Sequence, residues 1–148
     1  MKKSIKTILL QDLFIGAWVF EYMEIPKRLS TPMYVEAIFE SGDIYLTFRE
    51  NEGDPFEAEI KNIRGIEITP DILRHFCFKE TDHNVFEKEC DGFKVVVFIS
   101  DHQHYRLVKA TIQHKTGGFK IDENLIFIHQ LQKFVFDSTR EPLVLDWK

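Results

Sequence analysis

Alternating hydrophobic and polar positions dominate residues 16–69 and predict a series of short strands, each with one buried face. The first strand begins at Trp18-Val19-Phe20. The next alternating segment places Val35, Ala37 and Phe39 on one face, opposite Tyr34, Glu36 and Ile38. Two further segments follow the same rule, with Ile44, Leu46 and Phe48 on one face and then Phe56, Ala58 and Ile60. Three consecutive alternating segments predict an antiparallel meander.

A short helix is expected next, because Thr69 is a favourable N-cap and Pro70 suits the first helical position. The pattern predicts this helix over residues 70–76. A second group of strands is expected near residues 85–90, 93–100, 105–113 and 118–121, with a tight hairpin turn at Asp91-Gly92. The continuous hydrophobic run from Val95 to Ile99 predicts a central strand. An amphipathic helix over residues 128–136, ended by Glu141-Pro142, would cover one face of this sheet.

These elements predict an α+β fold. The first part, residues 1–69, is expected to be an SH3-like small β-barrel or a bent antiparallel sheet. The second part, residues 70–148, is expected to be an antiparallel sheet packed by the carboxy-terminal helix. We expect the two parts to pack into one compact unit.

Composition narrows the function classes but selects none of them. The chain has 148 residues, a net charge of -5 and a hydrophobic content of 44%, which is typical of a folded soluble protein. The negative net charge argues against nucleic-acid binding. If the protein does bind nucleic acid, we expect the predicted barrel and the amino-terminal lysines Lys2, Lys3 and Lys6 to provide the surface. No signal peptide or membrane span is recognised, so a cytoplasmic protein is expected, with Cys77 and Cys90 reduced.

Catalytic and cofactor motifs are absent from the sequence: we find no P-loop, G-x-G-x-x-G, G-x-S-x-G or H-E-x-x-H pattern. No cofactor is therefore expected, and the prediction leans away from an enzyme. One segment, Asp101-His102-Gln103-His104, has two histidines that would project from the same face of an extended strand and could bind a metal ion. The alternative for His102 and His104 is a solvated turn between two strands. His129 is expected to be a buried histidine rather than a catalytic base.

Aromatic residues are the candidates for contact with a partner protein, since aromatic side chains dominate the energetics of protein interfaces. We expect such contacts from four residues: Trp18, Tyr22, Tyr34 and Trp147. An exposed strand at the edge of either sheet would also allow a homodimer, although the sequence does not identify which strand.

Three segments resemble a family of small uncharacterised proteins from Bacteroidetes, often found on prophages and other mobile elements. They are residues 12–19, residues 66–78 and residues 128–136, which are similar to the family patterns LRIGN-V, I-LTEE-L---GF and VHQLQNLYF-LTGEEL. The resemblance implies no activity. A family glycine aligns with Arg140, where a left-handed backbone would cost roughly 1 kcal/mol that glycine avoids. Another aligns with Cys77, which argues against a left-handed helix end there.

The functional hypothesis from the sequence is therefore a non-enzymatic interaction or accessory module of a mobile element or its host. A metal-binding protein or metal-assisted enzyme around His102 and His104 is the second hypothesis. A nucleic-acid-binding small barrel is the third.

Overall fold

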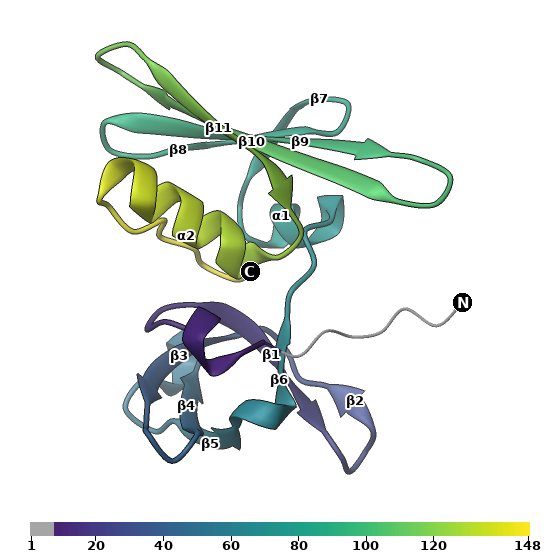
Figure 1. The fold of residues 1–148 in the computed structure, drawn as a ribbon, viewed down its shortest axis with the longest axis vertical. Helices are drawn as coiled ribbons and strands as arrows, with labels where there is room; N and C mark the ends of the chain where they lie inside the picture. The colour runs from purple at the N-terminus through teal and green to yellow at the C-terminus, as the bar shows by residue number, and fades with distance from the viewer. Residues whose placement is uncertain (1–7) are drawn as a thin grey trace. The chain divides into compact units, whose positions relative to one another are not determined.

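The computed structural model describes residues 8–148. They form two compact units, which divide between Ile66 and Glu67. The division falls after Ile66, whereas the sequence placed it at residue 69. Both units are built on antiparallel sheets, and the two α-helices belong to the second unit (Figure 1). Among the described residues, no helix has the length and hydropathy needed to span a membrane.

The first unit is one strongly curled sheet. Its strands are β1 (Trp18–Met23), β2 (Arg28–Leu29), β3 (Met33–Ile38), β4 (Asp43–Thr47), β5 (Phe56–Glu59) and β6 (Ile63–Gly65), with the 3-10 turns η1 (Leu10–Asp12), η2 (Arg49–Asn51) and η3 (Ile60–Asn62). The strand order is β2-β1-β3-β4-β5, and β6 pairs with β1. The predicted meander is confirmed for β3, β4 and β5.

The inner face of this sheet holds the core of the first unit. Its buried residues come from alternate positions of the strands, since successive side chains point to opposite faces. They include Val19, Met33, Val35, Ile44, Leu46, Ala58 and Ile63. Phe48 and Ile60 pack against this core as predicted.

A β-bulge in β3 corrects the predicted alternation of that strand. The register shifts between Val35 and Ala37, so that Ala37 pairs with Tyr45 while Val35 pairs with Leu46. An extra residue in one strand reverses the face of everything after it. Ile38 therefore packs against the core, and Phe39 becomes 43% exposed instead of sharing the face of Val35.

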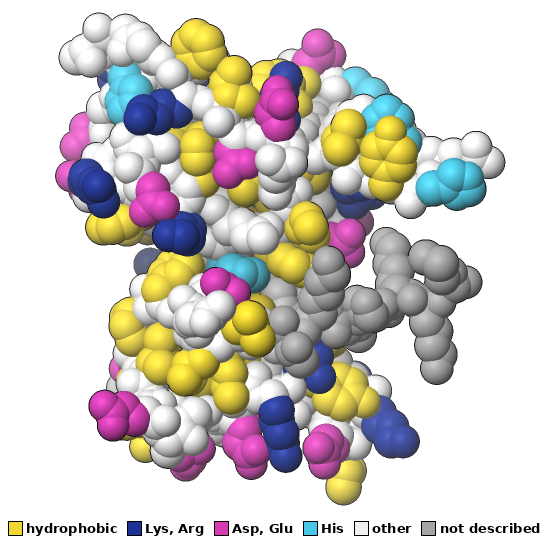
Figure 2. All heavy atoms as spheres, viewed as in Figure 1, with side chains coloured by type: hydrophobic (Ala, Val, Ile, Leu, Met, Phe, Trp, Pro, Cys, Tyr) yellow, Lys and Arg dark blue, Asp and Glu magenta, His cyan; other side chains and the backbone are white. Residues whose placement is uncertain are grey.

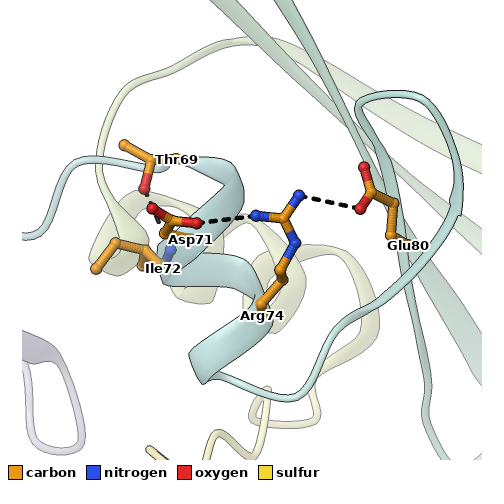
Figure 3. Close-up of polar contacts among 5 residues, drawn as sticks. All are labelled: Thr69, Asp71, Ile72, Arg74 and Glu80. Carbon is orange, nitrogen blue, oxygen red and sulfur yellow. Dashed lines mark hydrogen bonds and ion pairs between the residues drawn. The ribbon is translucent and has the colours of Figure 1, made fainter.

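The second unit begins with helix α1 (Pro70–His75), which starts as predicted. The Thr69 hydroxyl accepts a hydrogen bond from the Ile72 N–H at 3.2 Å, and Pro70 occupies the first turn. The Arg74 guanidinium donates to Asp71 at 2.8 Å and to Glu80 at 3.0 Å, so it connects the helix to the strand that follows (Figure 3).

Five strands form the sheet of this unit in the order β11-β10-β9-β8-β7. They are β7 (Lys79–Asp82), β8 (Val85–Glu89), β9 (Phe93–Asp101), β10 (Arg106–His114) and β11 (Phe119–Leu125). Strand β9 is central as predicted, and Val95, Val97 and Ile99 on one of its faces are buried. Helix α2 (Ile128–Thr139) lies along that side of the sheet and buries Ile128, Leu131 and Val135 (Figure 1).

Both α-helices end in a left-handed residue without glycine. Arg140 has φ 62°, and its N–H donates to the Phe136 carbonyl at 2.7 Å. Cys77 has φ 66°, which corrects the expectation that its side chain would exclude this conformation. The Cys77 N–H donates to the Arg74 carbonyl at 3.0 Å, and this bond fixes the turn that leads from α1 to β7.

Candidate functional site

The curled sheet of the first unit carries a group of aromatic side chains on the face opposite its core. We call this group the aromatic face and define it as Trp18, Tyr34, Phe39 and Tyr45. Its members come from β1, β3, β4 and the turn after β3. Trp18, Tyr34 and Tyr45 share this face because Trp18 pairs with Tyr34 across β1 and β3, and Tyr34 pairs with Thr47, two residues from Tyr45 on β4.

Ring contacts join the aromatic face in two pairs. The ring centroids of Trp18 and Tyr34 are 5.2 Å apart, and those of Phe39 and Tyr45 are 4.9 Å apart with an edge-to-face geometry. Trp18 is buried, with 5% of its surface exposed. Tyr34 and Tyr45 are half-buried and Phe39 is exposed, so these three present ring surface to solvent while remaining held by their neighbours.

Carboxylates border the aromatic face. The Tyr34 hydroxyl donates a hydrogen bond to Glu52, and Glu57 lies directly opposite Tyr45 in the β4–β5 ladder. Glu36, at the bulge, is exposed and adds to the negative potential at Tyr34. The surface therefore combines aromatic rings with negative charge, a combination that attracts cations to ring faces.

The phenol of Tyr34 is stabilised in its neutral form. Burial, the hydrogen bond to Glu52 and the charges of Glu52 and Glu36 raise the pKa of Tyr34 to about 12. A tyrosine used as a base or nucleophile needs the opposite shift. Tyr34 is therefore suited to donating a hydrogen bond and offering its ring, not to proton abstraction.

The two other predicted partner contacts, Tyr22 and Trp147, have ring contacts of their own. The Arg64 guanidinium is stacked over Tyr22, 5.4 Å from its ring centroid. Trp147 is in the second unit, and its ring centroid lies 4.5 Å from that of His75 and 5.1 Å from that of Phe76. The Lys148 N–H also donates to the His75 carbonyl at 2.9 Å. The Trp147 ring contacts and this hydrogen bond together hold the carboxy-terminal segment against α1.

The segment containing His102 and His104 forms the turn between β9 and β10. The His102 N–H donates to the Tyr105 carbonyl at 2.8 Å, its ring stacks on Tyr105, and its Nε2 lies 3.1 Å from the Ser100 hydroxyl. Asp101 accepts a 2.6 Å hydrogen bond from Arg106. Residues 8–148 contain no group of three or more His, Cys, Asp or Glu side chains arranged to hold a metal ion.

The remaining chemical candidates are explained by packing. His129 is buried as expected, and its ring stacks on Phe127 at 5.5 Å. Burial raises the pKa of the Cys90 thiol, which disfavours the thiolate that a nucleophile requires. A hollow on the second unit mixes acidic and basic side chains, and Lys94 in it forms a 2.8 Å ion pair with Glu87.

Basic side chains do not gather into a single patch on the face shown in Figure 2, where they are interspersed with acidic ones. Lys2, Lys3 and Lys6, the basis of the nucleic-acid hypothesis, lie outside the described residues. Comparisons of the chain with protein-family models, with curated proteins and with solved structures found no match.

Sequence reasoning identified Trp18 and Tyr34 but missed Phe39 and Tyr45. Tyr45 lies between Ile44 and Leu46, which were predicted to share the buried face, and no role was predicted for Tyr45 itself. Phe39 was assigned to the core because the bulge at Glu36 was not recognised. A charged residue between Val35 and Ala37 was the available signal, but it also fits regular alternation.

Proposed function

We propose that the protein is a non-enzymatic interaction module whose aromatic face binds a positively charged, extended segment of a partner protein. The carrying observation is the presence of Tyr34, Phe39 and Tyr45 on one solvent-facing side of the sheet, bordered by Glu36, Glu52 and Glu57. Aromatic-lined surfaces of small β-domains bind extended, proline-rich segments, because such segments lose little entropy on binding. Arginine side chains would stack on the rings and pair with the carboxylates.

The first unit, on this proposal, is an SH3-like small barrel. Its short, strongly curled antiparallel strands and the closing pair of β1 with β6 support that assignment. The resemblance of the sequence to proteins of Bacteroidetes mobile elements supports an accessory role for such an element or its host. Both cysteines are free thiols, in keeping with a cytoplasmic protein.

The proposal is tested with three fluorescent peptides that differ only in the residue that alternates with proline. They alternate proline with arginine, with lysine or with glutamate, and their binding to the tag-free protein is measured by fluorescence anisotropy. We expect binding in the order arginine, lysine and then glutamate, with the last not detectable. The affinity for the arginine peptide should fall as salt is added, because the carboxylates are exposed.

Variants connect this binding to the aromatic face. Tyr45→Ala and Phe39→Ala should each weaken binding of the arginine peptide about tenfold, since an anchoring aromatic residue contributes roughly 1–2 kcal/mol. Phe119→Ala removes an exposed ring from the second unit and is the control. Failure to bind any of the three peptides, or equal losses in all three variants, would exclude the aromatic face as the binding surface.

A further inference from the structure

Strand β11 forms one edge of the five-stranded sheet and exposes large hydrophobic side chains there. Phe119 and Ile121 are 66% and 48% exposed. They lie on the sheet face opposite α2, because Ile121 pairs with Thr111 and Thr111 pairs with Val96, whereas Val95 and Val97 alternate with Val96 and point to the face that α2 covers. Lys120 and Asp122 project from the other face of the same strand.

The backbone N–H and C=O of Ile121 point away from the neighbouring strand β10. The His114 N–H donates to the Gly118 carbonyl across the β10–β11 turn at 3.1 Å. Backbone groups alternate along a strand, so the pairs of Ile112 with Lys120 and of Ala110 with Asp122 are the hydrogen-bonded pairs of this ladder. Ile121 lies between them, and its N–H and C=O therefore point to the open edge.

We propose that β11 pairs antiparallel with β11 of a second copy of this chain, about a two-fold axis at Ile121. In this register Ile121 exchanges two backbone hydrogen bonds with Ile121 of the second copy. Lys120 lies directly opposite Asp122 of the second copy, and Asp122 opposite its Lys120. These are non-hydrogen-bonded pairs, in which Cα atoms approach to about 4.5 Å and side chains are closest.

Charge selects this register over its neighbours. Sliding the second strand by two residues is the smallest shift that keeps the hydrophobic faces on the same side. In one direction the shift places Lys120 opposite Lys120, and in the other Asp122 opposite Asp122. Like charges directly opposite one another destabilise a strand pair, whereas opposite charges stabilise it. Of these three registers, only the one about Ile121 places Lys120 opposite Asp122.

The pairing would join two five-stranded sheets into one continuous sheet. Ile121 of each copy would extend the hydrophobic surface formed by Val96, Phe98 and Phe119 across the two-fold axis. A contact of one strand with another is smaller than the roughly 1,200–2,000 Å² of a standard interface, so a dimer that dissociates on dilution is expected. The inference concerns the second unit alone and does not depend on the aromatic face.

Sedimentation velocity of the whole chain, from about 1 μM to about 1 mM, covers the dissociation constants expected of such a contact. The wild type should change from monomer to dimer with concentration. K120D places carboxylates at both positions and D122K places amines at both. Each should raise the dissociation constant at least about tenfold, because every substitution acts twice across the axis. The double variant K120D/D122K should return to within about threefold of the wild type.

The decisive sample is an equimolar mixture of K120D and D122K. Each is expected to be monomeric alone, yet Lys and Asp face one another at every position of the mixed dimer, so the mixture should associate. Asp122 also accepts a hydrogen bond from the Asn124 N–H at 2.8 Å, so circular dichroism must show that D122K is folded. I121K, at an exposed position, tests the same axis without changing that bond and should also be monomeric. A wild type that stays monomeric, a dimer that K120D and I121K do not weaken, or folded single variants that fail to associate when mixed would each overturn the proposal.

Discussion

Replacing Arg140 with glycine is expected to stabilise the second unit. Arg140 ends α2 at φ 62° and ψ 14°, and its side chain is exposed, so its removal costs little packing. A left-handed residue with a Cβ atom costs about 1–2 kcal/mol relative to glycine. Glycine returns about 0.4–1 kcal/mol of this by making the unfolded chain more flexible. The net expectation for R140G is a gain of about 0.5–1 kcal/mol in the free energy of unfolding.

Urea denaturation followed by tryptophan fluorescence measures this gain. The chain has two tryptophans, so a Trp18→Phe background leaves Trp147 to report on the second unit. The transition midpoint should move to higher urea with an unchanged slope, because the surface exposed on unfolding is the same. R140A is the matched control: it removes the same charge and side chain but retains Cβ, so its stability should lie within about 0.5 kcal/mol of the background. An equal gain in R140A, or a loss in R140G, would refute the backbone argument.

Three further predictions follow from side-chain environments. C77G should also stabilise the second unit by about 0.5–1 kcal/mol in the same urea assay, and C77A should not, because Cys77 is left-handed as well. Ultraviolet titration should show one tyrosine ionising near pH 12 that disappears in Tyr34→Phe, and Glu52→Gln should lower this pKa because it replaces a charged hydrogen-bond acceptor with a neutral one. L131A should cost about 2–5 kcal/mol because Leu131 is fully buried, whereas F136A on the exposed side of α2 should cost far less; similar losses in both would contradict the assigned packing.

Much of the architecture follows from local patterns. Thr69-Pro70 places the start of α1, Asp91-Gly92 joins β8 to β9, and Val95 to Ile99 lie in the central strand. Each of these signals acts within a few residues, through a cap, a turn or a run of hydrophobic side chains. Strand β7 was missed for the same reason, because Lys-Glu-Thr-Asp has no hydrophobic alternation and pairs only because β8 provides a partner edge.

The candidate site was less predictable because it depends on long-range register. Trp18 and Tyr34 were selected by residue type, and no local pattern indicated that they would pair. The bulge in β3 decides whether Phe39 joins the core or the aromatic face, and the bulge is imposed by how β3 pairs with β4. Self-complementarity of β11 is visible in Phe-Lys-Ile-Asp-Glu, but it has meaning only once β11 is known to be an edge strand.

The plain order of the second sheet has a consequence for how quickly it can form. Every strand from β7 to β11 pairs with its neighbour in the chain, so the ladder can be built by successive hairpins with short loops to close. The contacts between Glu67 and Phe127 and between Ile68 and Ile126 span the whole meander and carry the largest loop-closure cost. We expect the rate-limiting step of folding in this unit to be closure of that bridge. Substitutions at Ile68, and in the β9–β10 turn that forms before the bridge closes, should therefore slow folding more than they speed unfolding.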